Sequence, residues 1–426
     1  MKEDFLHYVW RYQKFDNKNL LTTQKLSLKI IKTGFPHTDS GPDFKQAKIR
    51  IDDIEWNGAV EIHIKSSDWN RHEHQHDESY QNVVLHVVWQ NDLAIHHPDG
   101  SLIPTLELKD RIDIDLIEKY NQLQKSKDHI PCASQWPKVD SILKSQMFEK
   151  ALVERLLNKS EKAKSMFENE VQDWEQASYF MLLSAFGFKV NQYPFERLAE
   201  LLPYQIIKKY RSSVFQLEAL LFGAAGFLEF DFRDEYPNQL KNEWHFLRHK
   251  HAEVFQKELK FLEWKFLRLR PANFPTIRIA QLAQIFHLFD SLFEAFVIET
   301  NAKILLKRLK VGVSDYWMNH YQFDKLSTSK NKQLGANSIK IVVINTIPPL
   351  LASYANSIVE EKYMDKALSI LKELKPENNY ITKKFTVINT EFNSAFDSQA
   401  AIQLHNEYCQ PKRCLDCTIG LSLLKA

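Results

Sequence analysis

One part of the sequence gathers side chains that can do metal-dependent chemistry, in a β-rich stretch near the N-terminus. Asp43 follows a proline, and Glu61, His63 and Lys65 alternate along a later stretch. Two carboxylates that meet at one place are hard oxygen ligands for Mg²⁺ or Mn²⁺. An ion held there polarises a phosphodiester and lowers the pKa of an attacking water, while a nearby imidazole or ammonium group stabilises the charge on phosphate. We therefore predict Asp43 and Glu61 as metal ligands, and the catalytic residues as Asp43, Glu61, His63 and Lys65.

The strands that must position these residues form a predicted hairpin. Apolar and polar residues alternate over 60–65, which predicts a strand with Glu61 on its polar face. If Asp52-Asp53 forms the hairpin turn, strict pairing places Asp43 on the opposite, apolar face. One extra residue in the second strand corrects this pairing, and glycine tolerates the backbone angles of a bulge. We therefore predict a bulge at Asn57-Gly58 that brings Asp43 and Glu61 together.

The order of these residues resembles the PD-(D/E)xK nuclease superfamily, in which Pro-Asp at one strand start precedes Glu-x-Lys on the next strand. Pro42-Asp43 matches the first half, and Glu61-Ile62-His63 matches the second. The resemblance implies a metal-dependent nuclease acting on nucleic acid. His63 stands at the usual lysine position, and Lys65 is displaced by one pleat. A non-catalytic nucleic-acid-binding or scaffold protein with a degenerate nuclease fold is therefore the second hypothesis, and a solvated Glu–Lys strand face is the structural alternative.

Histidines are concentrated in the same stretch, where imidazole can serve as a proton shuttle or a metal ligand. His74 and Asp77 would share a face of a helix that starts there, and with His76 they suggest a third hypothesis, a hydrolase with a transition-metal site. We expect His72 to lie in a solvated loop. His86, in an otherwise apolar strand, is expected to be a core histidine that can back up the site. Seven of the 16 histidines lie here: His63, His72, His74, His76, His86, His96 and His97.

The C-terminal cysteines suggest a second metal site. Cys409, Cys414 and Cys417 form a C-x₄-C-x₂-C array, and Cys132 is the only other cysteine. Such spacing suits tetrahedral Zn²⁺, with Cys132 or His405 as the fourth ligand, and it also resembles part of a plant-type iron–sulfur pattern. Some RecB-like nucleases hold an iron–sulfur cluster with one remote and three clustered cysteines, but there the remote cysteine precedes the nuclease motifs. Any metal bound here is expected to have a structural role, attaching the C-terminal segment to the rest of the protein. Buried thiols packing a terminal helix are the alternative.

Composition and periodicity predict an α+β protein. Short alternating runs predict strands at 26–31, 47–51, 60–64 and 83–89, with helices at 5–14 and 111–124. Helical spacing predicts helices at 143–167, 172–186, 217–228, 279–305, 353–374 and 398–406. Proline-containing stretches at 271–275 and 346–349 are expected to be connections, and 383–387 a stray strand. The expected architecture is a small α/β domain with a mixed sheet (1–130), followed by a large helical domain (131–426).

The charge balance limits the expected partners. The net charge is +2, with 56 basic and 54 acidic residues, which excludes a uniformly basic nucleic-acid binder but not a local basic groove. Such a groove would use basic residues interleaved with aromatic ones, although these runs are commonly solvated helix faces. The candidates are Lys265, Arg268, Arg270 and Arg278. The sequence lacks a long apolar run, a secretory start and a disulfide-rich pattern, so we expect a cytoplasmic protein without a membrane span.

Seven segments spread over the chain form a combined motif pattern: 41–44, 58–63, 67–69, 84–88, 273–283, 394–400 and 408–420. Together they resemble a bacterial family named domain of unknown function 2851. The resemblance extends over nearly the whole chain. It implies no particular activity, so the nuclease hypothesis rests on the N-terminal residues.

Overall fold

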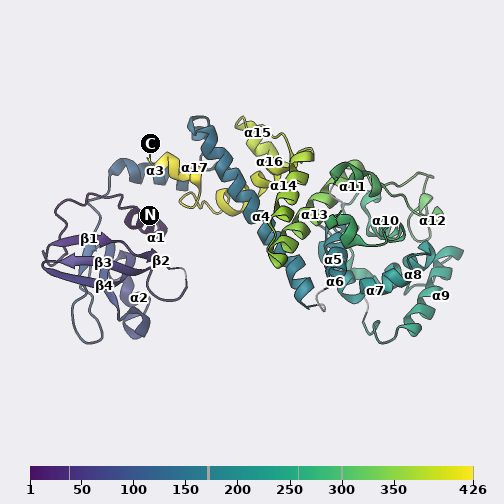
Figure 1. The fold of residues 1–426 in the computed structure, drawn as a ribbon, viewed down its shortest axis with the longest axis horizontal. Helices are drawn as coiled ribbons and strands as arrows, with labels where there is room; N and C mark the ends of the chain where they lie inside the picture. The colour runs from purple at the N-terminus through teal and green to yellow at the C-terminus, as the bar shows by residue number, and fades with distance from the viewer. Residues whose placement is uncertain (38, 170–172, 258, 299–300, 426) are drawn as a thin grey trace. The chain divides into compact units, whose positions relative to one another are not determined.

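The computed structural model describes every residue except 38, 170–172, 258, 299, 300 and 426. The chain forms two compact units, each described here by itself. Unit 1 comprises Met1–Met147, Lys384–Asn389 and Leu404–Ala426. Unit 2 comprises Phe148–Lys383 and Thr390–Gln403. The mixed sheet lies in unit 1 and most of the helices lie in unit 2, so the predicted α+β class is confirmed (Figure 1).

The sheet of unit 1 has the order β1-β3-β4-β5-β6, with β2 paired to β3. β3 runs antiparallel to β1 and β4, whereas the pairs β4–β5 and β5–β6 are parallel. The four strands predicted in the N-terminal region are all present. Their bounds are β1 (Leu28–Lys32), β2 (Phe35–Pro36), β3 (Phe44–Ile51), β4 (Ile54–Lys65), β5 (Val83–Gln90) and β6 (Thr105–Glu107).

The β3–β4 hairpin confirms the predicted turn and corrects the predicted bulge. Ile51 pairs with Ile54 across Asp52-Asp53, but the register shifts in β3, where Gln46 adopts a φ of 56°. The prediction of a bulge at Asn57-Gly58 is therefore wrong. A Cβ on Gly58 would lie 2.5 Å from Asn82 O and from a Val84 methyl carbon, so this glycine permits close strand approach instead.

One face of the sheet packs against helices from both ends of the chain. Val60 and Ile62 are buried, and Phe5 of α1 stacks on Tyr120 of α3 with 4.3 Å between ring centroids. α17 lies beside α3, so the C-terminus completes this unit (Figure 1). The helices are α1 (Glu3–Arg11), α2 (Asp68–Arg71), α3 (Ile114–Lys125) and α17 (Thr418–Lys425). Single turns are η1 (His74–His76), η2 (Glu78–Tyr80), η3 (Ala133–Lys138) and η7 (Leu404–Cys409).

Unit 2 is built from helices that pack around α13, which contacts α5 and α14. The first helices are α4 (Ser141–Asn169, starting in unit 1), α5 (Trp174–Phe186), α6 (Gln192–Leu201), α7 (Tyr204–Lys209), α8 (Val214–Ala224) and α9 (Glu235–Lys250). The next are α10 (Pro275–Leu288), α11 (Ala302–Arg308), α12 (Asp315–Met318), α13 (Ala336–Ile358), α14 (Glu361–Glu373), α15 (Tyr380–Val387) and α16 (Ala395–Gln403). Short elements are η4 (Phe261–Glu263), η5 (Pro271–Asn273), η6 (Glu294–Ile298), β7 (His320–Gln322) and β8 (Lys325–Leu326).

Four local predictions in this region are wrong. The stretch 346–349 is not a connection, because Pro348 and Pro349 lie inside α13, where buried apolar neighbours outweigh the helix penalty of proline. The stretch 383–387 is helical rather than a strand. The predicted helix 353–374 breaks at Val359, which has a φ of 57°. The predicted helix 279–305 ends as α10 at Leu288, and its residues 299 and 300 lie outside the described part.

One helix, α13, is long and apolar enough to cross a membrane by length and composition alone. Most of its apolar window, 67%, is buried within the described structure. That burial is the pattern of a core helix in a soluble protein.

Candidate functional site

The two predicted carboxylate ligands meet at the end of the β3–β4 hairpin. Because the extra residue lies in β3, Asp43 falls opposite Glu61 rather than opposite Ile62. The backbone N–H of Asp43 donates to Glu61 Oε2 at 3.1 Å, and the Ile62 N–H donates to Asp43 Oδ2 at 2.9 Å. His7 of α1 joins them, with Nε2 3.3 Å from Asp43 Oδ2. The structure therefore brings Asp43 and Glu61 together, as predicted, and adds a histidine that the sequence analysis missed.

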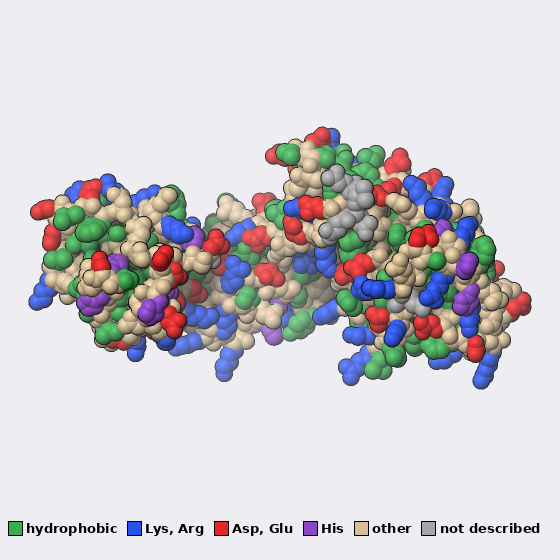
Figure 2. Space-filling model, turned by 90° about the horizontal axis from the view of Figure 1, so that it is seen from below, with side chains coloured by type: hydrophobic (Ala, Val, Ile, Leu, Met, Phe, Trp, Pro, Cys, Tyr) green, Lys and Arg blue, Asp and Glu red, His purple; other side chains and the backbone are tan. Residues whose placement is uncertain are grey.

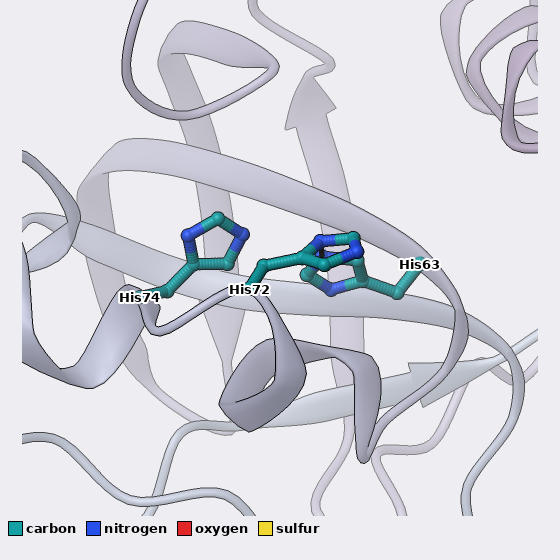
Figure 3. Close-up of side chains that lie close together, drawn as sticks. All are labelled: His63, His72 and His74. Atoms are coloured by element: carbon teal, nitrogen blue, oxygen red, sulfur yellow. Dashed lines mark hydrogen bonds between the residues drawn. The ribbon is translucent and has the colours of Figure 1, made fainter.

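Three histidines surround the buried carboxylate of Glu61. Glu61 Oε1 lies 3.5 Å from His63 Nε2 and 3.3 Å from His74 Nε2. His72 Nδ1 lies 3.2 Å from His63 Nε2. One ring nitrogen from each of the three histidines lies within 4.8 Å of the others, a spacing that suits a shared metal ion (Figure 3). We call Glu61, His63, His72 and His74 the histidine site.

The chain between β4 and β5 is folded back so that its histidines face the sheet. Lys65 N–H donates to Asp68 Oδ2 at 3.0 Å, which starts α2 directly after β4. Ser66 and Ser67 both hydrogen-bond to the Asp92 carboxylate, which ties this turn to the end of β5. Glu73 then adopts a left-handed conformation with a φ of 61°, between the two loop histidines. The turn geometry thereby places residues on either side of Glu73 over the same strand.

Aromatic burial fixes the same segment onto the polar face of β4. Trp69 and Tyr80 form a buried cluster with Ala59, which shares the face of Glu61. The Tyr80 ring stacks on His74 with 3.9 Å between centroids. Trp69 meets His74 edge-on at 5.4 Å. The hydrophobic effect on two aromatic side chains therefore holds a polar loop over a polar strand face.

His86 supports the site from the neighbouring strand. It pairs in register with Glu61, and its side chain is fully buried. His86 Nε2 lies 2.8 Å from His63 Nδ1. This agrees with the expectation of a core histidine behind the site. A hydrogen bond to Nδ1 orients the His63 ring and leaves Nε2 as the nitrogen that faces the histidine site.

Burial sets the charge state of these groups. It lowers the pKa of His63 to about 2 and that of His86 to about 3, with further lowering from nearby histidines. Burial also raises the pKa of Glu61, although the His74 imidazole, 3.3 Å away, opposes this. His63 and His86 are therefore neutral at pH 7. Neutral imidazoles beside a carboxylate are the protonation states that metal binding requires.

Other predicted residues lie outside the histidine site. Lys65 is exposed at the end of β4, and His76 is exposed as well. The Asp77 carboxylate accepts a hydrogen bond from the Ser79 N–H at 2.9 Å, which caps η2 and keeps the pKa of Asp77 low. Among the described residues, the group of closely spaced ligand atoms includes His74 but not Asp77. The expectation for His72 is also corrected, because its ring faces His63 although the residue is exposed.

The cysteines belong to unit 1 and are largely buried. Cys132 is 8% exposed, and Cys414 and Cys417 are each 7% exposed. Burial raises the pKa of Cys132 and of Cys414 to about 12, and that of Cys409 well above its usual range. The charges of the other three cysteines raise the pKa of Cys409 further, which places all four in one neighbourhood. His405 instead contacts Lys384 and Asn406, so Cys132 fits better as the fourth ligand.

The predicted basic residues of unit 2 differ in their environment. Lys265, Arg268 and Arg270 are exposed, whereas Arg278 is only 3% exposed within α10. Arg278 therefore cannot share an open surface with the other three. Figure 2 shows acidic and basic side chains intermixed over the visible face, as the near-neutral charge leads us to expect.

Comparison with known proteins identifies the family. The model of the family described as protein of unknown function (DUF2851) matches residues 3–380, a range that includes the histidine site and Arg278 but not the clustered cysteines. Neither the curated proteins nor the solved structures give a match. The resemblance noted from the sequence motifs is therefore confirmed. Because the match covers nearly the whole chain, the protein belongs to the DUF2851 family.

Proposed function

We propose that this protein is a metal-dependent hydrolase that cleaves phosphodiester bonds in nucleic acid, with its ion held at the histidine site. The observation that carries the proposal is the position of the Glu61 carboxylate, which is 5% exposed and lies within 3.5 Å of two histidine rings. A buried carboxylate costs free energy unless it is hydrogen-bonded and paired, and buried charges in proteins are commonly paired or coordinate a metal. A divalent cation is a partner that the carboxylate and the imidazoles can share.

The ligand chemistry favours a transition metal. Mg²⁺ prefers an all-oxygen octahedral site, whereas Mn²⁺ and Zn²⁺ accept imidazole nitrogen together with carboxylate oxygen. The candidate ligands are Glu61, His63, His72 and His74, with Asp43 adjacent. The carboxylates alone led us to expect Mg²⁺ or Mn²⁺. Because the site also contains imidazoles, Mn²⁺ suits these ligands better than Mg²⁺. Zn²⁺ is the second candidate.

A bound ion would polarise the phosphate and lower the pKa of a water molecule beside it. The protein's own contribution lies at Asp43 and His7, whose side chains are 23% and 36% exposed. Burial alone would lower the pKa of His7, but the Asp43 carboxylate, 3.3 Å away, raises it overall. His7 can thus hold a proton near neutral pH and donate it to the leaving oxygen. The Pro42-Asp43 and Glu61-x-His63 order supports phosphodiesters as the substrate class.

A cleavage assay with a matched control tests this function. Single- and double-stranded DNA and RNA are incubated with the purified protein and Mn²⁺, Mg²⁺ or Zn²⁺. Glu61→Gln keeps the side-chain shape but removes the charge. Glu55→Gln makes the same change on the same strand, where Glu55 pairs with Lys48 and Arg50 at the surface. We expect Mn²⁺-dependent cleavage that falls at least a hundredfold in Glu61→Gln and is unchanged in Glu55→Gln.

Absence of cleavage with every ion and substrate would contradict the hydrolase. The same samples then distinguish the alternative, a nucleic-acid-binding or scaffold protein, because gel shifts report binding without turnover. Exposed Lys265, Arg268 and Arg270 are the proposed contacts with nucleic acid in either case. Replacing all three with Gln should weaken binding and reduce its salt dependence, since fewer counterions are released.

We further propose that Cys132, Cys409, Cys414 and Cys417 bind a structural metal centre, either Zn²⁺ or an iron–sulfur cluster. Four thiols brought together from distant segments and shielded from solvent match the donor set of both centres. A Cβ on Gly420 would lie 2.1 Å from Cys414 O, so the cysteine loop packs directly on α17. Deprotonated thiolates would be stabilised by the metal, against the raised thiol pKa of the metal-free site.

Metal analysis of protein purified without oxygen tests this second site. Zinc, iron and acid-labile sulfide are measured, and visible absorption reports an iron–sulfur cluster. Cys132→Ser should lose most of the metal, whereas His405→Asn should retain it. If the purified protein contains no metal, or if Cys132→Ser retains all of it, the four cysteines do not form a metal centre and only pack the interior.

A further inference from the structure

Unit 2 contains a cavity of about 230 Å³ that no other proposed role uses. It lies where α5 ends, α10 begins and α13 begins. Its walls combine aromatic rings with amide, hydroxyl and guanidinium groups. The lining residues used below are Phe186, Phe188, Phe195, Asn273, Arg278 and Ser338.

Arg278 is held rigidly at the cavity wall. One terminal nitrogen donates to Gln281 Oε1 at 2.9 Å. The other donates to Asn273 Oδ1 at 2.7 Å and to Ser338 Oγ at 3.2 Å. The guanidinium also lies over the Phe188 ring, 4.8 Å from its centroid. The Nε–H is buried without a hydrogen-bond partner in the described structure. The side chain is therefore positioned by neutral groups and retains unused donor capacity.

The positive charge of Arg278 has no described acidic partner. None of the ion pairs among the described residues includes Arg278, and desolvation by burial is the one cause that lowers its pKa, to about 10. The group is thus still charged at pH 7. A guanidinium that is 3% exposed and lacks a counter-charge is costly to bury. Natural proteins retain such groups where a ligand supplies the missing negative charge.

Two helix N-termini add positive potential at the same place. α10 begins at Pro275 and α13 at Ala336, and the N-cap residues Phe274 and Gly335 provide no side-chain cap. Pro275, Asn337 and Ser338 line the cavity. The first turns of both helices carry partial positive charge from unsatisfied N–H groups. Placing Arg278 in the first turn of α10 is unfavourable by itself, because like charges meet there. An anion would reverse the sign of that interaction.

We propose that this cavity binds a small organic anion, with a phosphate or carboxylate group on Arg278 and a compact apolar or aromatic body between the phenylalanine rings. The Nε–H of Arg278, which is left without a partner, can donate to an oxygen of either anionic group, and Phe186, Phe188 and Phe195 provide the apolar walls. The volume limits the ligand to about the size of one substituted ring. This site is independent of the proposed hydrolase, because it lies in unit 2 and needs no metal ion.

Calorimetric titration at low salt tests the site with three probes: inorganic phosphate, phenyl phosphate and benzoate. We expect phenyl phosphate or benzoate to bind more tightly than inorganic phosphate, because the aromatic body fills the apolar walls. Comparison of phenyl phosphate with benzoate identifies the anionic group. Arg278→Gln should weaken binding at least tenfold. Arg233→Gln removes an exposed arginine elsewhere in unit 2 and should leave the affinity unchanged.

A second variant guards against loss of folding in Arg278→Gln. Ile341→Phe places a larger side chain in the cavity wall and leaves Arg278 in place. Its far-UV circular dichroism should match the wild type while binding is lost. The proposal is overturned if the folded wild-type protein binds none of the probes at millimolar concentration. It is equally overturned if Arg278→Gln and Arg233→Gln weaken binding to the same extent, since that result indicates diffuse surface attraction.

Discussion

At the scale of single residues, His86 illustrates how a group outside the proposed ligand set can control it. Its Nε2 lies 2.8 Å from His63 Nδ1, and both rings are buried. The hydrogen bond fixes how the His63 ring is turned and which of its nitrogens faces the site. A residue that never touches the ion can therefore determine how well it is held.

The first prediction concerns this support. His86→Asn should lower the affinity for Mn²⁺ by about 10- to 100-fold, because His63 loses its orienting partner. His76→Asn makes the same change at an exposed position of the same segment and should have no effect. Titration calorimetry with Mn²⁺ measures both, and Mn²⁺ is chosen because thiolates of the cysteine cluster bind it weakly. Equal Mn²⁺ affinities in the two variants would show that His86 does not support metal binding.

The second prediction follows from the neutral histidines. The pKa of His63 falls from 6.5 to about 2 on folding, and that of His86 to about 3. Below pH 6.5 the two histidines are therefore protonated in the unfolded chain but stay neutral in the folded unit. The free energy of unfolding consequently falls as the pH drops toward 3. Urea unfolding of metal-free protein at pH 7, 6 and 5 should show this loss. The loss should be smaller in His86→Asn, and an identical pH dependence would contradict the argument.

A buried carboxyl in unit 2 gives the opposite dependence. Burial raises the pKa of Glu218 from 4.5 to about 7, while Tyr236 and Trp317 donate hydrogen bonds to Oε2. The folded protein holds this proton more tightly than the unfolded chain does. Its stabilisation is thus complete below pH 4.5 and is lost as the pH rises through 7.

The third prediction uses Glu218→Gln, which keeps both acceptor contacts without a titrating group. At pH 8 the variant should be more stable than the wild type by up to about 3 kcal/mol, from the pKa difference between the two states. The two proteins should converge near pH 5. Denaturant unfolding followed by tryptophan fluorescence measures this difference. A variant that is less stable at pH 8 would show that the carboxylate form is the one the fold requires.

At the scale of elements, the bulge in β3 decides which side chains meet. Gln46 takes up the extra residue with a φ of 56°, and the pairing of Phe44 with Val60 follows from it. The same shift places Asp43 opposite Glu61. Without it, the pleat would direct the Asp43 carboxylate to the apolar face of the sheet. The strained residue Gln46, three positions after Asp43, is thus part of the site's construction.

The fourth prediction tests this strain. Gln46→Gly should raise stability by about 0.5–1 kcal/mol, because glycine adopts positive φ without the clash of a Cβ. Gln46→Val should lower it, since a β-branched side chain is least compatible with that backbone. Mn²⁺ affinity should be retained in Gln46→Gly, because the register is unchanged. Reversed stabilities would mean that the left-handed conformation at this position is not what holds the register.

At the scale of the whole molecule, unit 1 is closed by a segment from the far end of the chain. Gln124 Nε2 donates to the Lys412 carbonyl at 2.9 Å, and the Thr418 N–H donates to Met147 Sδ at 3.4 Å. Ile419 and Leu424 are buried in the same unit. The N-terminal residues therefore do not bury their apolar surface without the C-terminal ones.

The fifth prediction concerns that closure. A chain truncated after Gln403 lacks the last segment of unit 1, so its sheet-containing unit should melt at a lower temperature than in the full chain. Calorimetry should show the transition of unit 2 less affected. Cys132 should also react faster with a thiol reagent, because its cover is removed. An unchanged melting profile would mean that residues 1–147 are stable alone.

Much of the secondary structure followed from the sequence, because local periodicity reports which face of an element is buried. The strand 60–64 and the turn at Asp52-Asp53 were predicted from alternation and turn chemistry, and both are present. The same reasoning failed where packing overrode local preference. Pro348 and Pro349 lie within the buried core helix α13, and 383–387 is helical although its residues favour a strand.

The candidate site likewise has one part that the sequence predicted and one part that it did not. The meeting of Asp43 with Glu61 was predictable, because two strands joined by a tight turn leave only the register undecided. Sequence alone did not determine that His74 lies against Glu61 and His72 against His63, since this depends on burial of Trp69 and Tyr80.

Long-range contacts decided the rest. His7 reaches Asp43 from α1, Cys132 approaches cysteines near the C-terminus, and Arg278 lies in a cavity shared by three helices. The residue types show which chemistry is available, because imidazole, thiol and guanidinium groups are identified directly from the sequence. The contacts between these groups depend on the packing of segments that are far apart in sequence. A local sequence pattern cannot predict such contacts.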